Sequence, residues 1–513
     1  MNLDRMRRHG LDEVVDAVVV GTGAGGAPLL ARLAEAGLRV VALEAGRNLD
    51  PADFTPDETA SIDLYWTGER LSGGSTPEAF GGNNSGVGVG GSTLHWGAFV
   101  PRADARDLRL KTESGVGEDW LLTLDELRPY YEAVEAFIGV SGPSSYPWEP
   151  SRRYPLAPVA RNAPAEVMAR GCERTGIRYT DAPAAVLSRP FASPGGAERP
   201  PCVNCGACHQ GCFNGAKTSM DVTYLPRAVQ AGAEIRPDST VHTIERDRAG
   251  RVTGVVYRTA DGDRRQRCAA LILCGGAIET PRLLLHNGLG NSSGQVGQNY
   301  MAHLATQVWG FFETEMRMNK GYPSSLITED FIRPDKADFA GGYLLQSLGV
   351  LPMTWANLLA RGAGLWGSPL VEAIDRYNYA AGIGMNGECL PAADNRLTLS
   401  DEVDAIGVPK ARIMFSQGAN EQAMDRHAIA AMTAIWEAAG AQGIVSARRF
   451  AHTIGTCRMG RSADEAVVDA YGRSFDLPNM WICDNSVFPS SLAANPALTI
   501  MALSLRTADA ILA

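Results

Sequence analysis

The chain has 513 residues, of which 45% are hydrophobic and 20% charged, and its formal net charge at pH 7 is −10. This length exceeds what one hydrophobic core usually covers, so we expect two domains or one domain with a large insertion. The acidic balance argues against nucleic acid as a partner, because binding phosphates requires basic patches.

No targeting segment and no membrane span are expected. The twin arginine at Arg7 and Arg8 is followed by polar and charged residues instead of an apolar signal core. The apolar stretch 349–370 is broken by Pro352, Arg361 and several glycines. The ten cysteines are not spaced like a secreted disulfide framework. We therefore expect a cytoplasmic protein.

A β–turn–α–β unit opens the chain. The apolar run Asp16–Val20 predicts a strand, and a glycine-rich turn follows it at once. The next residues have a helical pattern that ends near Gly37, and a second strand is predicted at Arg39–Leu43.

The turn of this unit has the spacing of a dinucleotide-binding site. Gly21, Gly23 and Gly26 form a G-x-G-x-x-G pattern, and Glu44 lies 23 positions after the first glycine. Such glycines let a pyrophosphate approach the helix N-terminus, and the acid can bind ribose hydroxyls. Because Glu44 would repel a 2′-phosphate, FAD or NAD is favoured over NADP. The alternative is a strand–helix turn without a ligand.

A second glycine-rich loop covers residues 81–97. Its small residues could pass close to a flat ring system, and the alternative is a flexible surface loop. The candidate cofactor contacts in this loop are Gly91, Ser92, His95 and Trp96.

The middle of the chain contains two segments of different composition. Residues 235–257 read as antiparallel strands with a turn at Ala249-Gly250, and Ala269–Cys274 reads as a buried strand that leads into a helix through Leu285. Residues 305–441 carry many aromatics and few nucleotide-type turns, so we interpret them as an inserted, substrate-facing module whose tryptophans and tyrosines wall the substrate site.

The carboxy-terminal part returns to the first pattern. A strand is predicted at Met480–Cys483, followed by Asp484 as a further cofactor contact and by a helix over Pro496–Leu512. The residue before this helix is Asn495, and an Asn before Pro is a common helix N-cap.

His452 lies just before a tight glycine turn. A lone histidine is more often structural than catalytic. Alcohol oxidation, however, requires a base for the hydroxyl proton while the carbinol hydride leaves, and a histidine pKa near 6.5 suits that task.

Several motifs in order resemble the glucose–methanol–choline (GMC) oxidoreductases. They are the opening glycine turn, the GGST-x-HW loop, and the stretches 275–288, 297–303 and 452–502. The resemblance implies bound FAD, hydride transfer from an alcohol carbon to the flavin N5, and a catalytic pair that maps onto His452 as base and Asn495 as its hydrogen-bonding partner.

Pattern and resemblance together predict an α/β fold. A Rossmann-like FAD-binding domain would carry an inserted α+β substrate domain built on an antiparallel sheet. The expected FAD-binding parts are 1–155, 201–304 and 446–513, and the expected substrate-domain parts are 156–200 and 305–445.

Within the family, the GGST-x-HW loop looks most like the bacterial branch of glucose and gluconate dehydrogenases and pyranose oxidases. The resemblance favours the alcohol of a sugar, glycoside or aminosugar as substrate, with non-sugar alcohols such as sterols left open. Some relatives attach FAD covalently at the position of His95, and the alternative is a free ring packed on the flavin.

Four cysteines form a C-x2-C-x2-C-x3-C array, namely Cys202, Cys205, Cys208 and Cys212. Three of them resemble the iron–sulfur spacing of FAD-dependent bacterial glucose dehydrogenases, so a [3Fe–4S] or [4Fe–4S] cluster is expected. Zinc and plain thiols are the alternatives.

A cluster would make the protein a dehydrogenase that passes single electrons to an acceptor protein. Without a cluster the electrons would go directly to oxygen or quinone, as in an oxidase. A non-redox FAD lyase is a further alternative, because fold alone does not fix chemistry.

Overall fold

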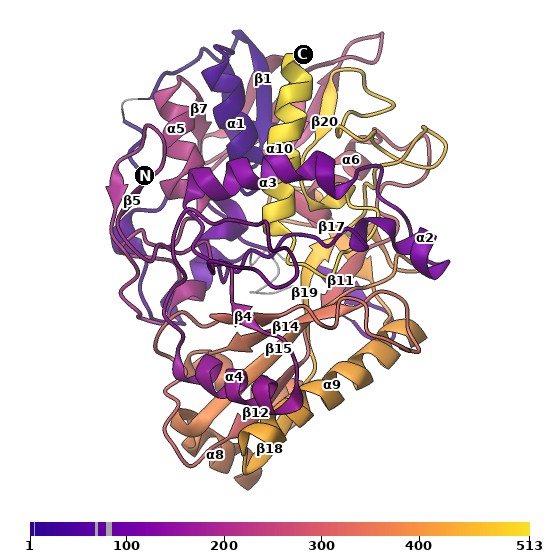
Figure 1. Cartoon of the computed structure of the whole chain (residues 1–513). Coiled ribbons are helices and arrows are strands. Elements are labelled where there is room, and N and C mark those ends of the chain that lie inside the picture. The colour runs from indigo at the N-terminus through magenta and orange to yellow at the C-terminus, as the bar shows by residue number, and fades with distance from the viewer. Residues whose placement is uncertain (5, 67–69, 78–84) are drawn as a thin grey trace.

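The first sheet has seven strands, and it takes strands from both the first and the last parts of the chain (Figure 1). A computed structural model describes residues 1–4, 6–66, 70–77 and 85–513, so residues 81–84 of the second glycine-rich loop lie outside the described part. The strand order is β7-β2-β1-β10-β9-β8, and β20 also pairs with β10. The bounds are Glu234–Arg236 (β7), Val40–Leu43 (β2), Val14–Val20 (β1), Gly262–Leu273 (β10), Val252–Thr259 (β9), Thr240–Arg246 (β8) and Met480–Ile482 (β20).

Five strands of this sheet run parallel, namely β7, β2, β1, the end of β10, and β20. The predicted strands at 16–20, 39–43 and 480–483 are confirmed within two residues, and the one predicted at 269–274 is the last part of the longer strand β10. We expected antiparallel strands over 235–257, and for the start of this segment the expectation was wrong. Ile235 lies in β7, which pairs in parallel with β2. The antiparallel pairing begins only with β8 and β9.

Helices cover both faces of this sheet. On one face α1 contacts α5 and α10, and α10 contacts α3, so that the indigo and yellow ends of the chain lie side by side in Figure 1. The helix α6 contacts β8. The bounds are Gly26–Glu35 (α1), Leu124–Ile138 (α3), Tyr224–Gln230 (α5), Gly276–Asn287 (α6) and Ala497–Leu512 (α10). The three predicted helices are thus confirmed.

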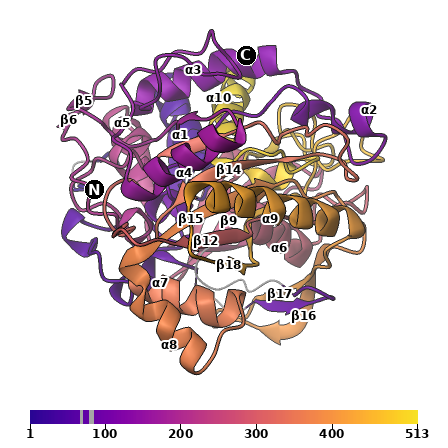
Figure 2. The same cartoon turned by 60° about the horizontal axis from the view of Figure 1, so that its bottom comes forward.

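The second sheet is antiparallel, with the order β18-β12-β15-β14-β13-β4, and β11 joins both β15 and β19. Helices α4 and α9 pack together against it (Figure 2). The bounds are Thr180–Asp181 (β4), Met301–Leu304 (β11), Gln307–Phe311 (β12), Leu326–Thr328 (β13), Tyr343–Leu348 (β14), Ala380–Gly387 (β15), Gly443–Ala447 (β18), Phe450–Ile454 (β19), Ala163–Thr175 (α4) and Ala419–Ala439 (α9).

The remaining elements are short. Strands β16, β17 and β3 form a small sheet whose strands β16 and β17 contact α6, and β5 pairs with β6. The helices α7 and α8 extend from the end of the second sheet (Figure 2). The bounds are Leu71–Gly73 (β3), Phe191–Ala192 (β5), Glu198–Arg199 (β6), Arg396–Val403 (β16), Pro409–Met414 (β17), Leu110–Ser114 (α2), Pro352–Asn357 (α7) and Ser368–Asp375 (α8).

The aromatic residues of the 305–441 segment fill hydrophobic cores instead of walling a substrate site. Trp309 and Trp355 are fully buried against each other, and Tyr343 lies in the core between the second sheet and its two helices. Trp366, by contrast, is exposed. Our expectation for these side chains was wrong, because their large apolar surfaces are needed between sheet and helices.

The fold class predicted from sequence is confirmed: an α/β nucleotide-binding-type sheet carries a second, antiparallel sheet with helices. The predicted domain boundaries stay a proposal, supported by α4 and β4, which belong to the second sheet although they precede the middle of the first. None of the helices in the described residues is long and apolar enough to span a membrane.

The first turn packs against the carboxy-terminal segment without room for a side chain. A Cβ built on Gly25 would lie 1.9 Å from the carbonyl oxygen of Cys483. Gly25→Ala therefore forces backbone movement, and we expect it to lower the free energy of unfolding by about 1–3 kcal/mol. The measurement is the midpoint of thermal unfolding.

Gly10→Ala is the matched control, since among the described residues the nearest atom to its Cβ would be 3.8 Å away, on Glu13. Equal midpoints for Gly25→Ala, Gly10→Ala and the parent protein would contradict this packing.

Candidate active site

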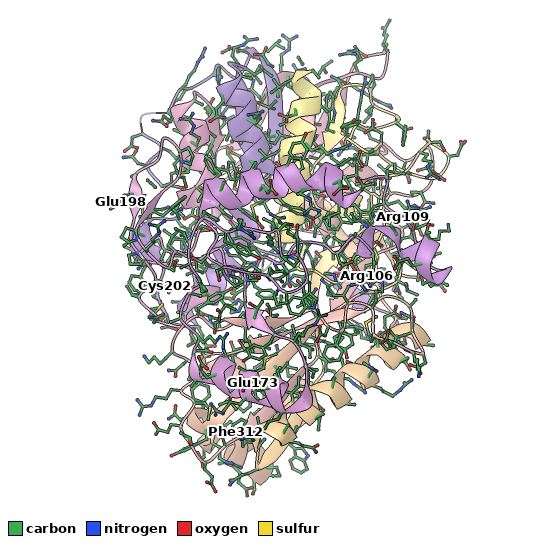
Figure 3. All side chains as sticks on the ribbon, viewed as in Figure 1. Arg106, Arg109, Glu173, Glu198, Cys202 and Phe312 are labelled. Atoms are coloured by element: carbon green, nitrogen blue, oxygen red, sulfur yellow. The ribbon has the colours of Figure 1, made fainter. Side chains whose placement is uncertain are left out.

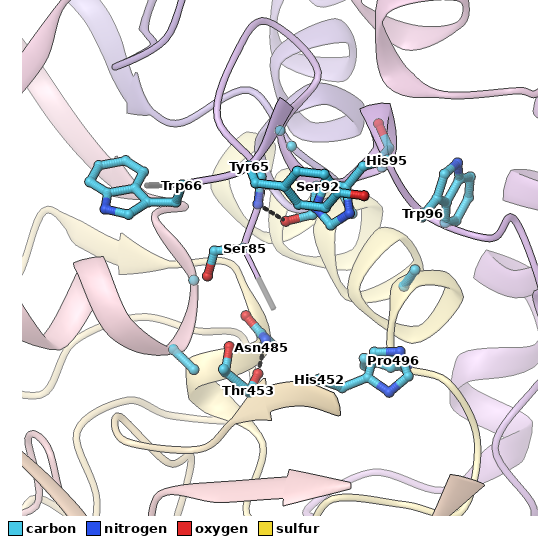
Figure 4. Close-up of a pocket in the computed structure, with 18 of the residues that line it drawn as sticks. Tyr65, Trp66, Ser85, Ser92, His95, Trp96, His452, Thr453, Asn485 and Pro496 are labelled. Atoms are coloured by element: carbon cyan, nitrogen blue, oxygen red, sulfur yellow. Dashed lines mark hydrogen bonds between the residues drawn. The ribbon is translucent and has the colours of Figure 1, made fainter. Parts of the chain in front are cut away.

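A cavity of about 420 Å³ opens where the parallel strands of the first sheet end. Residues at the carboxyl ends of β1, β2, β10 and β20 line it, as expected for a ligand site in a parallel sheet. The far wall comes from the second sheet and from the segment before α10. Figure 4 shows Tyr65, Ser92, His95 and Trp96 on one side of this cavity and His452 on the other.

The two glycine-rich segments meet at the cavity. A Cβ on Gly91 would lie 2.7 Å from Cα of Gly23, so these residues are in contact through their backbones. Gly21, Gly23 and Gly91 line the cavity, whereas Gly26 packs on Gly21, where a Cβ would lie 2.0 Å from the Gly21 carbonyl oxygen. Gly26 thus serves close packing of the helix on the turn.

Glu44 is buried at the end of β2 and lines the cavity. Its Oε2 accepts hydrogen bonds from the backbone nitrogen and the hydroxyl of Thr22, and its Oε1 accepts from the backbone nitrogens of Gly46 and Gly88. The carboxylate therefore joins three loops around the cavity. Ribose binding by Glu44 stays a prediction, and a ribose hydroxyl would share these acceptor positions.

Asp484 follows β20 and is also buried. Its Oδ2 accepts from the backbone nitrogen of Gly276, the first residue of α6, at 2.8 Å, and from the hydroxyl of Thr280, one turn further along this helix, at 2.6 Å. A carboxylate at a helix N-terminus is favourable there. The contact holds the start of α6 beside the cavity, next to the place predicted for the cofactor.

The 91–97 segment presents a histidine and a tryptophan toward the cavity. His95 is buried, and desolvation lowers the pKa of its imidazole to about 3. Ser92 Oγ accepts a hydrogen bond from the backbone nitrogen of Gly86. Among the described residues, neither Nε2 of His95 nor Nε1 of Trp96 has a hydrogen-bond partner, although both atoms are buried. Buried polar atoms of this kind need a ligand or water.

His452 occupies a bulge between β11 and β19. Ala302 pairs with Thr453 and His303 pairs with Ala451, so His452 is the extra residue, and its φ is +57°. A histidine in the left-handed region is uncommon and marks a place where the surrounding structure dictates the backbone. The bulge turns the ring toward the cavity.

Asn495 and His452 are brought together although 43 residues separate them. Asn495 Nδ2 lies 3.4 Å from His452 Nε2. The cap position of α10 is Pro496 and has no side-chain hydrogen bond, so the carboxamide of Asn495 is not used as a helix cap. Its Oδ1 is buried without a partner within the described part of the chain. The predicted pair thus lies at one site.

His303 belongs to this site and was missed by the sequence analysis. It is fully buried on β11, and its Nδ1 lies 3.0 Å from Nδ1 of His452. Burial lowers the pKa of His303 to about 4 and holds the pKa of His452 well below 6.5. The motif 297–303 carries His303, but nothing in its spacing points to His452, because a strand pairing makes the contact.

The second sheet supplies two glutamines to the cavity wall. Gln307 on β12 and Gln346 on β14 are both in register with Gly384 on β15, so their side chains lie on the same face with no side chain between them. The Oε1 atoms of both are buried, and neither has a hydrogen-bond partner among the residues described. The aromatic lining comes instead from the first part of the chain, with Tyr65, Trp66, Trp96 and Phe99.

The four cysteines of the array line a small separate cavity of about 20 Å³. All four are free thiols, and Figure 3 places Cys202 at the flank of the molecule. The backbone nitrogens of Asn204 and Lys217 donate to the sulfurs of Cys202 and Cys212. Burial raises the pKa of Cys208 to about 12. Within the described residues, no three His, Cys, Asp or Glu side chains are placed to hold a single metal ion.

The cysteine loop is bonded to the 91–97 segment. Lys217 is buried, and its Nζ donates to the carbonyl oxygens of Cys208 at 2.6 Å and Leu94 at 2.8 Å. His209 Nδ1 donates to the carbonyl oxygen of His95 at 3.0 Å. The array and the main cavity are therefore neighbours joined through two short contacts.

Comparison with known proteins identifies both halves of the chain. A GMC oxidoreductase family model matches residues 71–305, and a second model of the same description matches residues 391–504. The fructose dehydrogenase large subunit of Gluconobacter japonicus is 29% identical over 97% of this chain and 97% of its own length. The 2-methyl-1,2-propanediol dehydrogenase of Mycolicibacterium austroafricanum is 29% identical, with coverages of 96% and 94%.

The fold is also shared with solved structures. Pyridoxine 4-oxidase from Mesorbium loti superposes with a TM-score of 0.70 over 97% of this chain and 99% of its own, at 18% sequence identity. At that identity the likeness concerns the fold.

FAD is the cofactor that these matches imply, and the residues present fit it. The glycine turn, the buried acids at strand ends and the unpartnered nitrogens of His95 and Trp96 all border one elongated cavity. With two family models covering most of its length, the chain is an oxidoreductase of the GMC family.

Proposed function

We propose that this protein oxidises an alcohol group to a carbonyl, most favourably on a sugar, glycoside or aminosugar. His452 acts as the base and Asn495 orients the substrate. The observation that carries the proposal is the contact of these two side chains at the wall of the cavity that the family's cofactor would occupy.

FAD, held by the glycine turn, Glu44 and the 91–97 segment, would supply a two-electron acceptor for the carbinol hydride. The chain itself has to remove the hydroxyl proton. His452 is neutral at pH 7, because burial and the neighbouring His303 and Arg449 hold its pKa well below 6.5. A neutral imidazole can accept the proton directly. Asn495 has a free Oδ1 and an Nδ2 beside His452, so its carboxamide can hold the reacting hydroxyl there.

The two glutamines support a substrate with several hydroxyl or ammonium groups. Gln307 and Gln346 present buried amide oxygens that have no donor in the described part of the protein, and an unsatisfied buried acceptor costs about 1–3 kcal/mol. Hydroxyls of a polyol satisfy such acceptors, and the aliphatic chain of a simple alcohol does not. The similarity to a fructose dehydrogenase subunit also supports a sugar substrate. The similarity to a diol dehydrogenase supports smaller polyols as the alternative.

We further propose that electrons leave through an iron–sulfur cluster held by Cys202, Cys205, Cys208 and Cys212. Support comes from the four thiols that line one cavity, from the backbone nitrogens aimed at two of the sulfurs, and from the contacts of Lys217 with the 91–97 segment. Thiolate ligands and N–H···S bonds are the usual surroundings of such clusters.

An acceptor protein has a place to dock beside this loop. Val203 and Phe213 flank the array, and both are apolar side chains that are about half exposed, at 55% and 45%. These two side chains are the proposed contact surface for an acceptor protein.

Replacing His452 by Ala removes the base. We expect the rate constant of flavin reduction by substrate to fall by about 10²–10⁴-fold while FAD stays bound. Anaerobic stopped-flow mixing with a panel of sugars and alcohols measures it. The control is His286→Ala, a half-buried histidine that does not line the cavity. Reduction of the His452→Ala flavin at the parent rate would remove the assignment of the base.

Replacing Gln307 or Gln346 by Leu removes a hydroxyl acceptor. We expect weaker binding of polyhydroxylated substrates, by about tenfold for each variant, with little change for alcohols that carry only the reacting hydroxyl. The substrate dissociation constant comes from the concentration dependence of flavin reduction. Gln422→Leu, an exposed position on α9, is the control. If neither cavity variant changes sugar affinity, these side chains do not bind the substrate.

Protein purified without air should contain about three or four iron atoms per chain and a similar amount of acid-labile sulfide. We expect Cys208→Ser to lower both and Cys172→Ser, a buried thiol in the other core, to leave both unchanged. Metal and sulfide analysis decides among the alternatives: zinc without sulfide indicates a structural site, and neither metal nor sulfide removes the relay.

A further inference from the structure

The two ring nitrogens of His303 face different kinds of partner. Nε2 lies 2.9 Å from the carbonyl oxygens of both Ser491 and Leu492. A carbonyl oxygen only accepts hydrogen bonds, so Nε2 of His303 carries the hydrogen and donates it. In a neutral imidazole the other nitrogen then has a lone pair, and Nδ1 of His303 is an acceptor.

This assignment fixes the hydrogen of the neighbouring ring. Nδ1 of His452 lies 3.0 Å from Nδ1 of His303, and one of the two must donate. Because Nδ1 of His303 accepts, Nδ1 of His452 carries the hydrogen. The lone pair of His452 is therefore on Nε2, the nitrogen that faces the amide donor of Asn495.

We propose that His303 is a positioning residue that holds His452 in the tautomer with its lone pair on Nε2, directed at the substrate hydroxyl. The proposal rests on the proposed function, in which His452 is the base. It adds the reason why one nitrogen of that ring, and not the other, is basic.

The surroundings of both rings keep the pair neutral. His303 is completely buried, and burial lowers its pKa to about 4. His452 faces His303 and the positive charge of Arg449, and both lower its pKa further. Two neutral rings in hydrogen-bond contact share a single hydrogen between their Nδ1 atoms.

The backbone holds the two rings in register. His452 is the extra residue of the bulge opposite Ala302 and His303. On the other side, Asn386 Nδ2 donates to the carbonyl oxygen of Ala493 at 2.7 Å, which fixes the segment that carries the carbonyls of Ser491 and Leu492. Each partner of His303 is thus held by a separate element.

During the reaction the chain of contacts stabilises the positive charge formed. The hydroxyl proton moves to Nε2 of His452 as the hydride leaves the carbinol carbon, so the ring becomes an imidazolium. Its Nδ1–H still donates to His303, whose own hydrogen bonds to two carbonyls polarise it in the favourable sense. A carbonyl cannot take a proton at this pH, so His303 cannot pass a proton onward through Nε2.

Three substitutions separate this role from simple packing. His303→Asn keeps an acceptor at the place of Nδ1, whereas His303→Gln keeps a group at the place of Nε2 without that acceptor, and His303→Leu keeps neither. We expect flavin reduction to slow by about 10–100-fold in the Leu and Gln variants and to recover most of that loss in the Asn variant. Substrate dissociation constants should change little.

The measurement uses FAD-loaded protein in anaerobic stopped-flow experiments, with His452→Ala alongside. If all His303 variants reduce flavin at the parent rate while His452→Ala is slow, the role proposed for His303 is wrong and the assignment of His452 as base stands. A parent rate in His452→Ala overturns the proposed base itself. Equal losses in the Asn, Gln and Leu variants indicate a packing role and also overturn the inference.

A direct measurement covers the case in which the variants do not fold. The ¹⁵N spectrum of histidine-labelled holoprotein distinguishes protonated from unprotonated ring nitrogens, and comparison with His452→Ala assigns the signals of His452. We expect Nδ1 of His452 to carry the hydrogen and Nε2 to lack it at pH 7. The reverse pattern would overturn the proposal.

Discussion

The whole arrangement depends on backbone contacts between the first glycine turn and strand ends from distant parts of the chain. A Cβ on Gly25 would lie 1.9 Å from the carbonyl oxygen of Cys483, and one on Gly26 would lie 2.0 Å from that of Gly21. Ser504 of α10 adds hydrogen bonds to Leu29 and to Gly25. These contacts bring the last strand and helix beside the first, so Asp484 and Asn495 share a cavity with Glu44.

The proposed catalytic groups lie at the cavity between the strand ends of the first sheet and the second sheet. β11 and β19 pair there, and their bulge presents His452 in a left-handed conformation that a regular strand would not allow. The segment before α10 supplies Asn495 and the carbonyls that bind His303. The strained residue is thus held by hydrogen bonds from two other segments, β11 and the segment before α10, which suits a group that has to keep one orientation through the reaction.

The cysteine loop is also held to the main cavity by hydrogen bonds from distant residues. Lys217 and His209 bond the loop to the segment that carries His95 and Trp96, so the proposed entry and exit of electrons share one rigid wall. Cys202 lies at the flank of the molecule and lines one small cavity with the other three thiols, whereas the second sheet lines the proposed substrate side of the main cavity. Oxidation and electron transfer to a partner can then proceed from different faces.

Strand and helix periodicity and glycine spacing in the sequence determined the nucleotide-binding unit, because these are short-range properties. The candidate pair His452 and Asn495 came from the resemblance of several short motifs to a known family. The sequence patterns led to wrong predictions for the aromatic residues of 305–441 and for the pairing of Ile235. An aromatic residue is equally suited to a hydrophobic core and to a cavity wall, and the sequence of a strand does not specify which strand pairs with it. Only the tertiary structure decided that His303 meets His452 and that Gln307 and Gln346 face the cavity. Those contacts come from strand register and a bulge, which join residues up to about 150 positions apart and leave no mark in the local sequence.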